Sequence, residues 1–150
     1  MWFNNKTTAA LGCAVVVAAA LATPAAAAVE QAACPTPEHK SVVVELAGPG
    51  RWSYTYHVTW CVEAGKITGI TPHLTNTTDG SVCTSFTSAE EAEWPLGNGS
   101  EAWRAFNMGE FSCKKGDGTD GSVNPWGTIE VLPDGRSRIV EKGIGDVRVE

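Results

Sequence analysis

The sequence has few basic residues and none of the short motifs of the common hydrolases. It contains 11 Lys and Arg against 17 Asp and Glu among 150 residues. Affinity for nucleic acids comes largely from basic side chains that neutralise phosphates, so we expect no nucleic-acid partner. No G-x-S-x-G, H-E-x-x-H or suitably placed S-x-x-K is present. These absences argue against enzymatic activity, and a small hydrolase with a triad built from distant residues stays an alternative.

The sequence also lacks an apolar run long enough to cross a membrane as a helix. Residues 9–22 are uncharged and follow one lysine, Lys6, but a membrane-spanning helix needs about 20 apolar residues. The small residues at 26–28 then provide an A-x-A cleavage site. We predict a signal peptide at residues 1–28, an extended lead-in at 29–40, a single β-rich domain at 41–150, and a secreted product without a stable membrane anchor.

Cleavage of this leader changes both the charge and the cysteine count. One basic residue is lost, so 10 basic residues stand against 17 acidic ones, a net charge of −7. Four of the five cysteines are left, and an even number in an exported chain predicts two disulfides. No C-x-x-C pair is present, which disfavours zinc, and we expect no metal or cofactor.

The pairing of these cysteines is predicted from the first hairpin. If residues 47 and 51 oppose each other across the turn at 48–50, Cys61 comes close to the lead-in that carries Cys34. We therefore predict the disulfides Cys34–Cys61 and Cys83–Cys113.

The clearest strand signal is the strict alternation in residues 51–62 (RWSYTYHVTWCV). One face carries an aromatic stripe, Trp52, Tyr54, Tyr56 and Trp60. We interpret the stripe as the core face of a central strand, because large aromatic side chains dominate burial energetics. The alternative is an exposed platform on which sugar rings stack.

Other segments predict short strands separated by turns and one short helix. Ser88 to Glu91 has the form of a capping box, with a helix that would end before Pro95. In that helix Glu90, Glu91 and Glu93 would be solvated acids in the first turns. The predicted strands are residues 41–47, 67–76, 81–87, 101–106, 110–113, 126–132 and 136–141.

The last two of these strands flank Pro-Asp-Gly and predict a hairpin. Its register places Glu130 opposite Arg138 and Ile129 opposite Ile139. Together these elements predict a mainly β fold, an antiparallel β-sandwich or small barrel with one short helix and two disulfides.

The segments WSYTYHVTWCVEAGKIT, WRAFNMGEFSC and PWGTIEVLPDG resemble small secreted proteins of actinobacteria. The resemblance covers most of the mature chain and implies no catalytic or binding residue. Secreted protease and amylase inhibitors of the same bacteria share the size and architecture class. The chain has neither a Cys-Pro reactive-site loop nor a Trp-Arg-Tyr turn, since Ala105 follows Trp103 and Arg104.

Three tryptophans lie near predicted loops or strand ends, where they suit ligand contact: Trp94, Trp103 and Trp126. We predict an extracellular, non-enzymatic binding domain for a glycan or a protein. An inhibitor of secreted proteases or glycosidases is the main alternative, and it would insert a loop such as residues 95–100 or 114–125 into its target.

Overall fold

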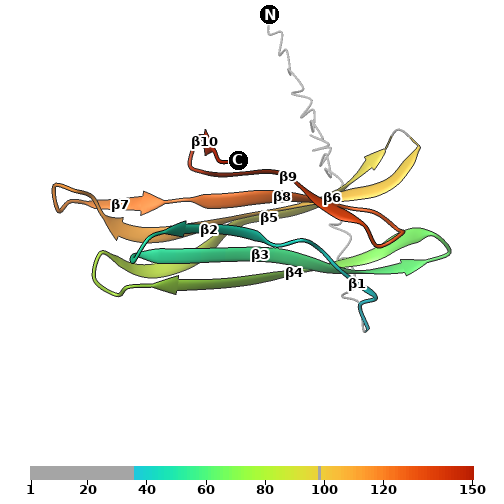
Figure 1. Cartoon of the computed structure of the whole chain (residues 1–150), viewed down its shortest axis with the longest axis horizontal. Coiled ribbons are helices and arrows are strands. Elements are labelled where there is room, and N and C mark those ends of the chain that lie inside the picture. Colours follow the sequence, from blue (N-terminus) through green and yellow to red (C-terminus); the bar gives the residue numbers. More distant parts are fainter. Residues whose placement is uncertain (1–35, 98) are drawn as a thin grey trace, which may run out of the picture.

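The computed structural model describes residues 36–97 and 99–150, and it shows two antiparallel sheets packed face to face (Figure 1). Sheet A has β3 at its centre, with β1 and β2 along one side and β4 along the other. Its strands are β1 (His39–Lys40), β2 (Val44–Gly48), β3 (Trp52–Glu63) and β4 (Lys66–Thr78).

Sheet B runs in the order β10-β9-β8-β6-β5, and β7 pairs with β6 beyond the end of β8. Its strands are β5 (Cys83–Gly97), β6 (Ser100–Lys114), β7 (Asp120–Val123), β8 (Pro125–Val131), β9 (Ser137–Ile144) and β10 (Val147–Arg148). The architecture is therefore a two-layer sandwich. Neither sheet closes into a small barrel, the alternative that the sequence allowed.

The aromatic stripe of β3 forms the centre of the core. Its side chains are at most 7% exposed and face the inner side of sheet B. The Trp60 indole nitrogen donates to the Leu132 carbonyl at 3.1 Å, and the Trp52 ring lies 5.1 Å from that of Phe111. The alternation of β3 therefore places its large residues between the sheets, where their burial contributes most.

The predicted short helix is wrong. Residues 83–97 form the single strand β5, which pairs with β6 along its length and carries a bulge between Ser88 and Glu90. A capping box contributes only local hydrogen bonds, and here a long partner strand outweighs that preference. Pro95 is tolerated here because β5 is an edge strand, where proline is confined when it occurs within a sheet.

The two strands predicted at 101–106 and 110–113 are one strand, β6. The chain does not turn between the two predicted strands, and Gly109 faces the Phe86 ring, which lies 2.3 Å from where a Cβ would stand. The glycine therefore makes room for an aromatic side chain and does not reverse the chain.

Of the two predicted hairpin registers, one is confirmed and one is wrong. The C-terminal hairpin pairs Glu130 with Arg138 and Ile129 with Ile139, as predicted. In the first hairpin Ala47 opposes Ser53 instead of Arg51, because the turn extends through Arg51 with Gly50 at a φ of 67°.

The disulfide Cys83–Cys113 is confirmed and joins the start of β5 to the end of β6. The pairing of Cys34 with Cys61 stays a prediction, because Cys34 lies outside the described residues. Cys61 is in the disulfide-bonded state, and its Sγ lies 3.5 Å from the Thr36 carbonyl oxygen. The predicted signal peptide also lies outside the described residues, and within the lead-in His39 and Lys40 pair with β3.

Candidate ligand-binding face

The predicted binding tryptophans divide between the interior and the surface. Trp103 points inward from β6 and packs against the core. Trp94 is 38% exposed and Trp126 is half-buried, and both lie on the outer face of sheet B. The structure thus brings two of the three to one face. The buried stripe of β3 does not form a surface platform.

A third ring, Phe106, lies between these two tryptophans. Ala105 and Phe111 of β6 are fully buried between the sheets, so the alternate residues Arg104, Phe106 and Met108 point outward. Trp94 of β5 opposes Arg104, and Trp126 of β8 opposes Met108. Because opposed residues share a face, Trp94, Phe106 and Trp126 form a diagonal across three neighbouring strands. We name these three residues the aromatic row.

The spacing of the aromatic row follows from sheet geometry. Each step advances two residues along a strand and one strand across, which places successive Cα atoms about 8 Å apart. The ring centroids of Phe106 and Trp126 are 6.4 Å apart. Sequence analysis missed Phe106, although its outward position could be found by continuing the alternation of Trp103 and Ala105 along the strand.

Trp126 is held in one orientation by the strand beside it. It opposes Gly143 of β9, and two indole carbons lie 2.5 and 2.6 Å from where a Cβ of that glycine would stand. The indole nitrogen donates to the Gly145 carbonyl at 2.8 Å. The indole therefore packs directly on a glycine with its N–H fixed, so binding a ligand would cost little side-chain entropy there.

A charged group adjoins the row next to Trp94. Glu130 of β8 is 8% exposed and lies between Arg104 of β6 and Arg138 of β9. Arg138 donates to both carboxylate oxygens at 3.0 and 2.9 Å, and an Arg104 nitrogen lies 3.5 Å from Glu130. The bidentate pairing fixes the Arg138 guanidinium, and Arg104 lies beside Glu130 at one end of the aromatic row.

A second polar group lies between the sheets. The Tyr54 hydroxyl donates to Asn107, 2.9 Å from Oδ1 and 3.1 Å from the main-chain oxygen, and Asn107 Nδ2 donates to Glu91 at 3.2 Å. Burial of Glu93 raises the pKa of its carboxyl group, and the nearby Glu91 carboxylate raises it further. The buried Tyr56 hydroxyl has no hydrogen-bond partner within residues 36–97 and 99–150. Of the acids predicted to be solvated, Glu90 and Glu91 are exposed, whereas Glu93 is partly buried on the same side of β5 as Glu91.

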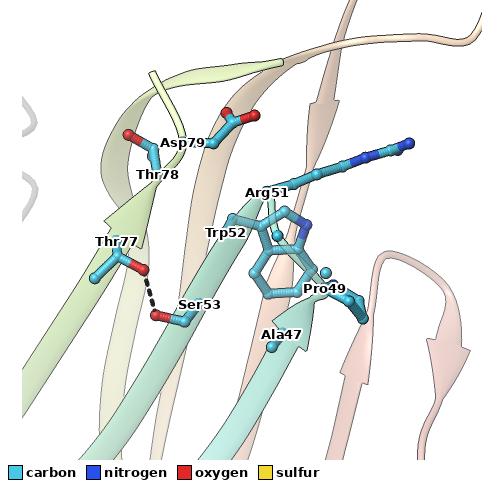
Figure 2. A pocket seen from close by; sticks show the side chains of 10 residues that line it. Ala47, Pro49, Arg51, Trp52, Ser53, Thr77, Thr78 and Asp79 are labelled. Carbon is cyan, nitrogen blue, oxygen red and sulfur yellow. Dashed lines mark hydrogen bonds between the residues drawn. The ribbon is translucent and has the colours of Figure 1, made fainter. Parts of the chain in front are cut away.

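A depression of about 320 Å³ lies where the β2–β3 turn meets the end of β4 (Figure 2). The Ser53 hydroxyl of β3 and the Thr77 hydroxyl of the neighbouring strand β4 form a hydrogen bond of 2.6 Å. Figure 2 shows the two hydroxyls facing each other. The carboxylate of Asp79 accepts hydrogen bonds from the main-chain nitrogens of the three residues at 81–83. The Cys83 N–H is the main cause that lowers the pKa of Asp79 to about 2. We interpret this carboxylate as a loop cap, because its oxygens accept hydrogen bonds from the residues that follow it in the same loop.

No helix in the described ranges is long and apolar enough to cross a membrane. The comparisons gave no relative: no family model, curated protein or solved structure matches the chain.

Proposed function

We propose that this chain is a secreted, non-enzymatic module that binds an extended glycan along the aromatic row on the outer face of sheet B. The observation that carries the proposal is the row itself, Trp94, Phe106 and Trp126 on three neighbouring strands. Sugar rings have apolar C–H faces that stack on aromatic rings, and a line of rings on a flat sheet matches a chain of sugars better than a single small ligand.

The polar surroundings favour a neutral glycan over a polyanionic one. A mature chain with a net charge of −7 repels acidic polymers at long range. Glu130 offsets one of the two positive charges of Arg104 and Arg138, so this group attracts sulfates or uronates less than two unpaired guanidinium groups would, and its remaining N–H groups can donate to hydroxyls.

The Cys83–Cys113 disulfide indicates an oxidising compartment, where extracellular polysaccharides are encountered. Secretion as such rests on the predicted signal peptide.

The direct test is binding to a panel of neutral polysaccharides, namely cellulose, chitin, xylan and a soluble mixed-linkage β-glucan. Depletion from solution measures binding to the insoluble polymers, and calorimetry measures binding to soluble oligosaccharides. We expect at least one of them to bind. Trp126→Ala and Trp94→Ala should each weaken binding by about tenfold, the loss that corresponds to one stacking contact.

The matched control is Thr75→Ala on the outer face of sheet A, which should bind like the wild type. Far-UV circular dichroism checks that every variant keeps the fold. Failure of the whole panel to bind, or full binding by a folded Trp94/Trp126 double variant, would refute the proposal. In that event, inhibition of secreted proteases or glycosidases would be the next function to assay.

A further inference from the structure

Two of the three histidines of the chain face each other on the outer side of sheet A. His57 of β3 opposes His73 of β4 in the antiparallel register. Their rings are stacked, with centroids 4.8 Å apart and planes 14° from parallel. His73 is exposed and His57 half-buried, so solvent reaches this pair from outside the sandwich. The aromatic row lies on the other sheet, so this histidine pair is independent of the proposed glycan-binding face.

We propose that His57 and His73 together chelate a late first-row transition-metal dication, with zinc as the biologically relevant case. Imidazole nitrogen is a preferred ligand for Zn²⁺, Ni²⁺ and Cu²⁺. Directly opposed side chains on antiparallel strands have Cβ atoms about 5 Å apart, which allows two imidazoles to reach one ion. In the stacked arrangement the ring nitrogens lie in parallel planes. The ring torsion of histidine is soft, so a turn of the His57 ring can direct its lone pair toward an ion held by His73.

A hydroxyl beside the pair prepares one of the rings for this role. Thr59 Oγ1 lies 2.9 Å from His73 Nε2. When Nε2 carries the proton and donates to this oxygen, Nδ1 is left with the lone pair that a metal needs. In metal-binding histidines the N–H of the second ring nitrogen usually donates a hydrogen bond to an oxygen in this way. That hydrogen bond fixes both the tautomer and the orientation of the ring.

The two imidazoles are the protein ligands of this site. Within the described ranges no group of three or more His, Cys, Asp or Glu is placed to hold a metal. Water would therefore complete the coordination, and we expect a weak, exchangeable site.

The test is titration of the full chain with Zn²⁺ by calorimetry, with Mg²⁺ as the hard-cation control. We expect saturable binding of one Zn²⁺ and none of Mg²⁺, since Mg²⁺ prefers oxygen ligands. Loss of an outer-shell partner alone costs metal sites about 10- to 100-fold in affinity, so His57→Gln and His73→Gln should each weaken Zn²⁺ binding by more than about tenfold.

The third histidine supplies the matched control. The His39 ring lies 5.3 Å from that of Trp60, tilted by 38°, on the opposite face of sheet A from His57 and His73, and His39→Gln should bind Zn²⁺ like the wild type. Histidine NMR signals give a second readout, because Zn²⁺ should shift those of His57 and His73 and leave those of His39 in place. The proposal is overturned if the wild type does not bind Zn²⁺, if either single variant keeps wild-type affinity, or if His39→Gln loses as much as the other two.

Discussion

Tyr54 and Tyr56 offer a matched pair of substitutions on the same face of one strand. Both side chains are 0% exposed, and both point from β3 toward sheet B. They differ in what their hydroxyls meet. The Tyr54 hydroxyl donates to Asn107, whereas that of Tyr56 has no hydrogen-bond partner in the part of the chain that the structure describes. Replacement by Phe removes one oxygen from each and leaves the ring to fill the same space.

Tyr54→Phe should lower the free energy of unfolding, whereas Tyr56→Phe should not. Tyr54→Phe removes a hydrogen bond and takes a donor from a buried amide, which should lower the free energy of unfolding by about 1–3 kcal/mol. Tyr56→Phe removes a buried hydroxyl that gains nothing in return for its lost hydration. Its free energy of unfolding should therefore stay unchanged or rise by about 1 kcal/mol.

Urea unfolding followed by tryptophan fluorescence, with the Cys83–Cys113 disulfide intact, measures both values. Equal slopes of the unfolding free energy against urea concentration would show that the two variants expose the same amount of surface on unfolding. The midpoint for Tyr54→Phe should fall clearly below that for Tyr56→Phe. If Tyr56→Phe proves as destabilising as Tyr54→Phe, the Tyr56 hydroxyl has a partner in solution and the reasoning is refuted.

Three further changes have defined outcomes. Asp79 has a pKa of about 2 when folded and about 3.9 when unfolded, so it contributes stability above pH 4 that is lost as the pH falls toward 2; Asp79→Asn should lower the melting temperature at pH 7 and flatten its acid dependence, and an unchanged profile would contradict this. Replacing Cys83 and Cys113 together by Ala should cost about 3–4 kcal/mol in urea unfolding, from a closed loop of 30 residues. Gly143→Ala would place a methyl group 2.4 Å from a main-chain oxygen and 2.5 Å from the Trp126 ring, and should cost about 1–3 kcal/mol and change the tryptophan emission. Unaltered emission would show that the indole does not rest on this glycine.

The core and the last hairpin could be predicted because their signals are local. The alternation of residues 52–60 specifies one buried face without reference to any other strand. The turn at 133–135 fixes the register of its two flanking strands through the sequence of the turn itself. In both cases the residues that decide the structure are neighbours along the chain.

The predicted helix at 88–94 failed because the deciding partner is distant in the sequence. Its acids and its Ser-x-x-Glu pattern are typical of a helix start, but β6 supplies a continuous partner strand to this segment. The aromatic row had the same difficulty. Trp94 and Trp126 belong to strands on opposite sides of β6, and only the pairing of both with that strand puts Phe106 between them.

The division of large and small residues between the sheets explains why aromatic rings are left on the outer face of sheet B. The inner face of β3 carries the bulkiest side chains of the fold, and the middle of β6 opposes them with Ala105, Asn107 and Gly109, between the inward rings of Trp103 and Phe111. Two packed sheets lie about 10 Å apart, so bulk on one side requires small residues on the other. The outward rings of sheet B take no part in this packing between the sheets. Replacing Trp94 should therefore weaken ligand binding far more than folding, whereas replacing Trp60 should do the reverse.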